Sequence, residues 1–120
     1  MSNENLKIRT KQFALRVIKL VENLPKDDVS KILGRQLLRA GTSVGANYRA
    51  ACRSKSSPDF ISKMGTVEEE ADESGYWMEL LVESGKARSD RLSSLMQEAG
   101  ELTAIAVASI NTARKSERRR

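Results

Sequence analysis

Apolar residues recur every three or four positions along almost the whole chain, and no segment alternates between apolar and polar residues. Spacing of three to four places side chains on one face of an α-helix, whereas a half-buried strand requires a period of two. The 120 residues contain only two prolines and seven glycines and are enough for one domain but not for two. The pattern therefore predicts a single all-α domain of long amphipathic helices.

The predicted helices are separated by recognisable breaks. Pro25 ends the first, a serine cap and Pro58 begin the third, and Gly85 is placed to end it. The expected helices cover about 8–24, 27–54, 58–84 and 90–113, and the basic tail 114–120 is expected to be frayed and solvated. Short connections make consecutive helices antiparallel, so residues 1–120 are predicted to form one antiparallel up-down-up-down four-helix bundle.

The apolar stripe of the second helix is expected to begin at Val29. Small and polar residues interrupt it. Gly41 and Gly45 would each destabilise an isolated helix by about 1 kcal/mol relative to alanine, so we expect another helix to approach closely there. Polar side chains near a core need hydrogen-bond partners. We expect three of them to pair with a facing helix and fix its register: Gln36, Ser43 and Asn47.

The residue types argue against catalysis. Histidine is absent, which removes the commonest general base and zinc ligand, and Cys52 is interpreted as a small packing residue. Glu68 with Asp72, or Glu69 with Glu73, has helical spacing for a two-carboxylate metal site, but no histidine or paired glutamate on another helix completes it. We therefore predict a non-enzymatic protein with no catalytic residue, no cofactor and no metal.

The sequence also bears on location. No stretch approaches the roughly 18 consecutive apolar residues of a membrane span. Residues 1–16 lack the apolar centre of a signal peptide, and a single cysteine cannot form an internal disulfide. We expect a cytoplasmic protein with no membrane partner.

Charge is sorted along the chain: residues 1–57 carry +8, residues 58–101 carry −7 and residues 102–120 carry +4. At 100° per residue, five cations of the second helix fall within a sector of about 80° opposite its apolar stripe. That sector contains no acid, although a solvated helix face usually mixes both signs. The five residues, called the basic stripe below, are Lys31, Arg35, Arg39, Arg49 and Arg53.

The third helix has the opposite character, because carboxylates point away from its predicted core and Tyr76 projects among them. This acidic face consists of Glu69, Asp72, Glu73, Tyr76 and Glu79, with Glu83 beyond it and Glu68 at its margin. Apolar residues also lie outside the predicted core: Leu15, Ile18, Ala104, Ile105 and Ala108. Surplus apolar surface and complementary faces indicate a partner, most simply another copy. We therefore expect a homo-oligomeric ring acting as a scaffold or as an accessory to a second protein.

A second interpretation assigns the basic stripe to nucleic acid. Its five cations would contact RNA or DNA phosphates, assisted by Lys11, Arg16 and the tail Arg118–Arg120. Few aromatic residues are available to stack on single-stranded bases. Binding would then follow charge and shape with little sequence specificity. The sequence alone leaves both interpretations open.

Three segments resemble a known family: Gln36–Asn47 (QLLRAGTSVGAN), Ser57–Phe60 (SPDF) and Glu68–Ser74 (EEEADES). The chain is similar to the four-helix-bundle family named for proteins encoded in intervening sequences of bacterial 23S ribosomal RNA genes. The family pattern continues after the asparagine with a small residue and Glu-Gly. Here Asn47 is followed by Tyr48-Arg49, so no role of that pair is carried over.

The resemblance implies a left-handed four-helix bundle, often assembled as a homopentamer, without known enzymatic activity. Accessory proteins of diversity-generating retroelements look similar. For them the resemblance implies basic surfaces that bind nucleic acid and a reverse transcriptase.

Overall fold

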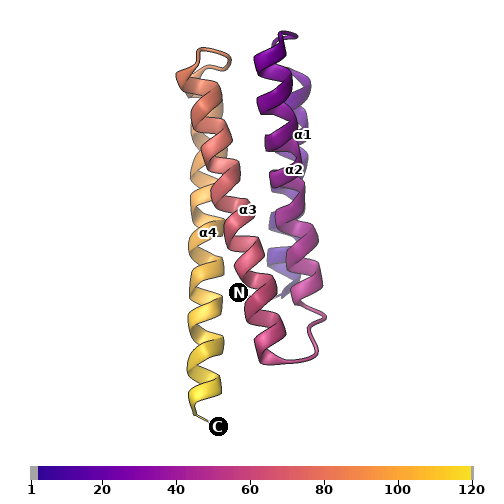
Figure 1. Ribbon diagram of the computed structural model, residues 1–120, viewed down its shortest axis with the longest axis vertical. Coiled ribbons are helices and arrows are strands. Elements are labelled where there is room, and N and C mark those ends of the chain that lie inside the picture. Colours follow the sequence, from indigo (N-terminus) through magenta and orange to yellow (C-terminus); the bar gives the residue numbers. More distant parts are fainter. Residues whose placement is uncertain (1–2, 120) are drawn as a thin grey trace.

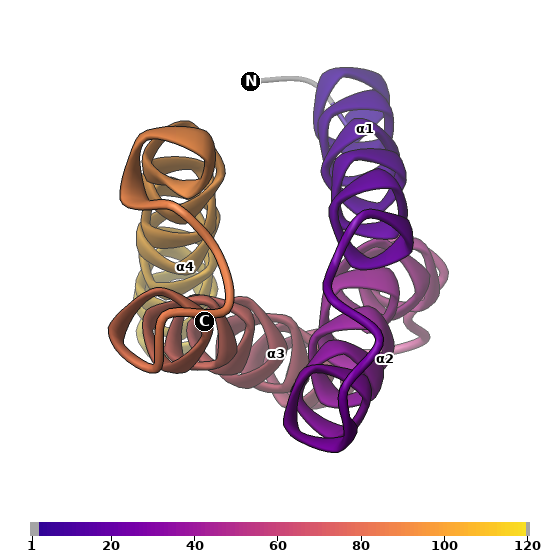
Figure 2. The same ribbon diagram turned by 90° about the horizontal axis from the view of Figure 1, so that it is seen from above.

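The computed structural model describes residues 3–119, which form four long helices (Figure 1). Consecutive helices run in opposite directions and occupy the corners of a four-cornered arrangement when viewed along the rod (Figure 2). The rod measures 53 × 22 × 20 Å. The predicted all-α, up-down-up-down four-helix bundle is confirmed. The helices are α1 (Asn3–Glu22), α2 (Asp28–Ala51), α3 (Ser57–Glu83) and α4 (Ser89–Arg118).

The helix ends follow the sequence signals in part. The side chains of Asp27 and Ser56 accept hydrogen bonds from the first turns of α2 and α3, and Gly85 follows α3 with a φ of +77°. The expectation of a frayed tail from residue 114 is wrong, because α4 continues to Arg118. Residues 101–119 contain no glycine or proline that would stop the helix. Similarly, α1 begins at Asn3 and not near residue 8.

The core is formed by one stripe from each helix, as the periodicity predicts. Phe13, Leu37, Met78 and Leu92 are among its fully buried members. The stripe of α2 begins one residue later than predicted, because Val29 is 48% exposed while Ser30 is buried. Burial of Ser30 is tolerated because its hydroxyl donates to the Asp27 carboxylate at 3.0 Å.

The register of α2 does not depend on the polar residues that the sequence suggested. Gln36 is exposed and Ser43 is half-buried. The side-chain amide of Asn47 donates to the Ser43 carbonyl within α2 at 2.8 Å. The prediction that these residues pair with a facing helix is therefore wrong for Gln36 and Asn47. A half-buried amide on a helix can be satisfied by a carbonyl one turn earlier.

The position of α2 against α1 is fixed by close packing at glycines and not by polar side-chain pairs. A Cβ atom on Gly41 would lie 2.8 and 2.9 Å from the two Cγ atoms of Val17. A Cβ on Gly45 would lie 3.1 Å from the Thr10 hydroxyl oxygen, and Gly34 faces Leu24 in the same way. The prediction of a close helix approach at Gly41 and Gly45 is confirmed, and the approaching helix is α1.

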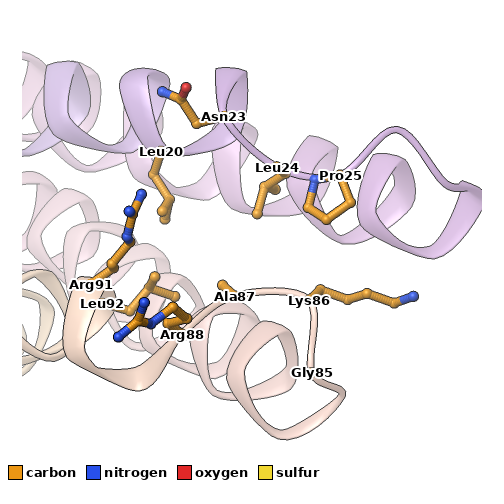
Figure 3. A pocket seen from close by; sticks show the side chains of 10 residues that line it. All are labelled: Leu20, Asn23, Leu24, Pro25, Gly85, Lys86, Ala87, Arg88, Arg91 and Leu92. Carbon is orange, nitrogen blue, oxygen red and sulfur yellow. The ribbon is translucent and has the colours of Figure 1, made fainter.

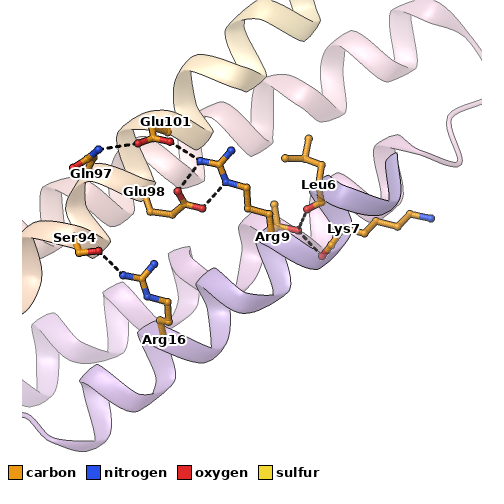
Figure 4. A network of polar contacts seen from close by, with 9 residues as sticks. Leu6, Lys7, Arg9, Arg16, Ser94, Gln97, Glu98 and Glu101 are labelled. Atoms are coloured by element: carbon orange, nitrogen blue, oxygen red, sulfur yellow. Dashed lines mark hydrogen bonds and ion pairs between the residues drawn. The ribbon is translucent and has the colours of Figure 1, made fainter. Parts of the chain in front are cut away.

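The remaining seam, between α1 and α4, is the least packed of the four. A polar network bridges it (Figure 4). The Arg9 guanidinium donates to both carboxylate oxygens of Glu98 at 2.7 Å and to Glu101 at 2.7 Å. About two turns further along α1, Arg16 donates to the Ser94 hydroxyl at 3.0 Å. Hydrogen bonding to Arg9 holds the pKa of Glu98 below its ordinary value.

Substitution Gly41→Ala tests the α1–α2 contact. The added methyl meets the branched Val17 side chain, so we expect overpacking of about 1–3 kcal/mol to outweigh a helix-propensity gain of about 1 kcal/mol. Urea unfolding should show a lower free energy of unfolding. The same change at Gly65, where a Cβ meets nothing within 4 Å, should be neutral or stabilising. Adding Val17→Ala to Gly41→Ala should relieve the clash. Equal effects at Gly41 and Gly65 would contradict the packing argument.

Substitution Arg9→Met tests the α1–α4 bridge. Because the folded pKa of Glu98 is lowered, its contribution to stability is present above the unfolded pKa of glutamate and is lost as the pH falls through the folded value. We expect Arg9→Met to lower the free energy of unfolding by about 1 kcal/mol at pH 7 and to flatten the decline below pH 5. Urea titrations across that range measure both effects. Lys11→Met, at an exposed position on the same helix, should leave the decline of the free energy of unfolding below pH 5 unchanged.

Candidate interaction surfaces

The basic stripe is fully presented to solvent along the outer face of α2. All five side chains, Lys31, Arg35, Arg39, Arg49 and Arg53, belong to exposed residues. Within residues 3–119 none of them forms an ion pair. Four of its residues, from Lys31 to Arg49, span 18 residues or roughly 27 Å of α2, whereas Arg53 lies beyond the helix, which ends at Ala51 and not at the expected residue 54. The fold therefore leaves this charge uncompensated on the protomer.

Acidic residues of α3 line two cavities between α3 and α4, together called the acidic groove below. Its lower part, of about 350 Å³, includes Glu68 and Glu69 and also the cation Arg114. Its middle part, of about 290 Å³, includes Asp72, Tyr76 and Glu79. Glu73 is exposed but does not line it. None of these carboxylates forms an ion pair with a residue in the described part of the chain.

The floor of the acidic groove was not identified from the sequence. It is formed by small residues on both helices, among them Gly75, Ala99 and Gly100. A Cβ on Gly75 would only just reach that of Ala99, at 4.0 Å, and one on Gly100 would meet nothing within 4 Å. The available signal was the occurrence of glycine in the interior of two expected helices, at Gly75 and Gly100. Tyr76 stands at the rim, 51% exposed, with its ring edge-to-face against Trp77 at 5.2 Å.

The surplus apolar surface differs in part from the prediction. Leu15 is 55% exposed, and Ala104 and Ala108 are exposed. Ile105 was expected to point outward, but it is half-buried and packs against the core, because the widely spaced α1 and α4 expose more of the α4 surface to the interior. Ile18 is half-buried as well. The most exposed large apolar side chain in the described chain is Ile32, at 59%, which is adjacent in sequence to Lys31 of the basic stripe.

A second group of cations lies towards one end of the rod, because the α2–α3 connection and the C-terminal end of α4 are at the same end (Figure 1). Because α4 stays helical to Arg118, three of these cations, Arg114, Lys115 and Arg118, are held on an ordered helix. Arg120 lies outside the described residues. The cations of this region that form no ion pair within residues 3–119 are Arg49, Arg53, Lys55, Arg114, Lys115, Arg118 and Arg119.

The opposite end of the rod contains a cavity of about 570 Å³ between the α1–α2 and α3–α4 connections. Leu20 and Leu24 point towards the α3–α4 side, and Leu92 faces them from α4 (Figure 3). Two of the three cations at this cavity are already paired: Lys86 with Asp27 at 3.4 Å and Arg88 with Asp90 at 2.8 Å. Among the cations at this cavity, Arg91 alone forms no ion pair with a residue in the described part of the chain.

Residues 3–119 contain no cluster of three His, Cys, Asp or Glu side chains that could hold a metal ion. Cys52 is half-buried, and its thiol is not part of a disulfide. Over the same residues, no helix combines the length and the apolar character that crossing a bilayer requires.

Comparison with known proteins places the chain in a family. Residues 4–108 match the model of the 23S rRNA-intervening sequence protein family. A solved structure from Bacteroides thetaiotaomicron, described as a protein with unknown function from the S23 ribosomal protein family, is 31% identical with a TM-score of 0.85, and the match covers 92% of this chain and 99% of that one. No curated protein matches the chain. Together with the four-helix bundle, the family match over most of the chain shows that this protein belongs to the 23S rRNA-intervening sequence protein family.

Proposed function

We propose that the protein is a non-enzymatic, homo-oligomeric scaffold in which the basic stripe of one copy docks into the acidic groove of the next. One observation carries the proposal: the cations of the basic stripe and three carboxylates of the groove, Glu69, Asp72 and Glu79, are exposed and lack ion-pair partners within residues 3–119. Opposite potentials on two surfaces of one molecule favour association between copies.

The shapes of the two surfaces support this pairing. Ile32 is 59% exposed and lies three residues before Arg35, so an apolar side chain accompanies the cations. The small-residue floor around Gly75 and Gly100 leaves room for it. Because the two surfaces are on different elements, the contact is heterologous, and repetition closes a ring if the rotation permits. A pentameric ring is the form that the family resemblance implies.

Charge reversal tests the assembly. We expect Arg35→Glu/Arg39→Glu to convert an oligomer to a monomer in sedimentation velocity, because it places like charges against Asp72 and Glu79 of the neighbour. Asp72→Lys/Glu79→Lys should have the same effect alone. Combined in one chain, the four changes should restore the oligomer.

The matched control is Lys19→Glu/Arg91→Glu, which reverses two exposed cations outside both surfaces and changes the net charge equally. It should keep the wild-type mass, and far-UV circular dichroism should show an intact bundle in every variant. A monomeric wild-type protein, or an oligomer that survives Arg35→Glu/Arg39→Glu, would overturn the proposed interface.

A second candidate function, binding of RNA or DNA, is supported by seven cations at the end of α2, in the α2–α3 connection and at the C-terminal end of α4 that form no ion pair within residues 3–119. Phosphate contacts from lysine and arginine release counterions and provide affinity with little sequence dependence. Assembly would place several such ends on one particle and raise the avidity for a long polyanion.

Salt dependence tests this function. Affinity for a duplex probe should fall linearly with the logarithm of the salt concentration, and Arg49→Glu/Arg53→Glu should reduce the slope by about 2, since each lost phosphate contact contributes roughly 0.9. Fluorescence anisotropy measures both quantities. Lys19→Glu/Arg91→Glu should change the slope much less. Binding that ignores salt, or equal losses in the two variants, would argue against a phosphate-binding surface at this end.

A further inference from the structure

A cavity of about 560 Å³ opens at the end of the rod where the unpaired cations gather. All four helices contribute to it, with Leu6 from α1, Tyr48 from α2 and Phe60 from α3. The longest wall belongs to α4 and consists of Ile105, Ala108, Ser109, Thr112, Ala113 and Ser116. Its volume lies within the roughly 300–1,000 Å³ of small-molecule sites.

The lining combines apolar surface with hydroxyl groups. Leu6 is buried and Phe60 is half-buried, packed against the core. Ser109, Thr112 and Ser116 follow one face of α4 at helical spacing, and within residues 3–119 their hydroxyls form no hydrogen bond that would occupy them. A hydroxyl both donates and accepts. The cavity therefore suits a flat group with apolar faces and polar edges.

The segments that line the cavity are rich in positive charge, although no charged side chain lines the cavity itself. The segments within three residues of its lining, together with the α2–α3 connection, are 3–9, 45–63 and 102–119. They contain ten Lys or Arg and three Asp or Glu, a net charge of +7 in a chain whose total is +5. Three of the ten, Lys7, Arg9 and Lys63, form ion pairs. Lys115 follows Thr112 by three residues and is its neighbour on α4, and Arg119 follows Ser116 by three residues at the C-cap of α4.

We propose that this cavity binds one unstacked nucleobase of a nucleic acid strand while the surrounding lysines and arginines hold the phosphates on either side. A nucleotide within a strand has a neutral, flat base flanked by negative charge, which matches an uncharged cavity inside a cationic rim. A small carboxylate or a fatty acid would instead place its charge at the cavity itself. Phe60 offers a stacking surface. The inference rests on the second candidate function above.

The test compares two single-stranded oligonucleotides of equal length and phosphate number, one carrying bases and one abasic throughout. In anisotropy titrations at one fixed ionic strength, we expect the wild-type protein to bind the base-bearing strand about tenfold more tightly. Both strands should show similar salt slopes, because the phosphate contacts are shared.

Two alanine substitutions on α4 provide a matched pair. Ala108 and Ala104 are both exposed and one turn apart, but only Ala108 lines the cavity. We expect Ala108→Phe to fill the space and abolish the preference for the base-bearing strand while retaining affinity for the abasic one. Ala104→Phe should behave as the wild type.

The outcomes separate the two levels of the proposal. If wild type binds both strands equally, the base pocket is wrong and the phosphate-binding surface stands. If neither strand binds, nucleic-acid binding fails and the pocket fails with it. Equal behaviour of Ala108→Phe and Ala104→Phe, or a polyglutamate probe that loses affinity in Ala108→Phe, would also overturn the assignment of a base to this cavity.

Discussion

The close approach of α1 to α2 is the contact on which the closure of the bundle depends. α3 packs extensively against both α2 and α4, whereas α1 packs only weakly against α4. Its position is therefore set mainly by α2, where Gly41 lets the Val17 side chain sit directly against the helix backbone. The Arg9 carboxylate bridge then holds α1 to α4 across the fourth side.

This uneven closure shapes the surface of the molecule. Four helices that met equally on all sides would leave narrow seams. Here the rod has cavities at both ends, each near the α1–α4 side, and a groove along α3 and α4 floored by small residues. The free charges differ among these places: carboxylates together with Arg114 line the groove, unpaired cations lie towards the α4 C-terminal end, and two of the three cations at the other cavity are paired. Both proposed functions rest on this distribution of charge.

The burial and the partners of a residue could be predicted where helical spacing within its own segment was enough to determine them. The buried stripe of α4 follows directly from the sequence, because its apolar residues keep helical spacing from Leu92 to Ile110. The prediction that Val29 begins the buried stripe of α2 is wrong, because a displacement of one residue turns a side chain by 100°. The Asp27 cap allows Ser30 to occupy the buried position instead. The prediction that Asn47 pairs with a facing helix is wrong, because its side-chain amide donates to a carbonyl of its own helix. The end of α4 was misjudged because a basic sequence does not itself terminate a helix.

By itself, the sequence determined the all-α class, the four antiparallel helices and the outward placement of the basic stripe and the acidic face. Those properties depend on periodicity and on short connections, which are local. Only the tertiary structure decided that the α2 glycines face Val17 and Thr10, that Arg9 bridges to Glu98, that small residues of α3 and α4 form one groove, and that Leu6, Phe60 and Ser116 surround one cavity. These features join residues that are distant in the chain, and their geometry depends on the rotation and spacing of packed helices, which an amphipathic pattern does not specify.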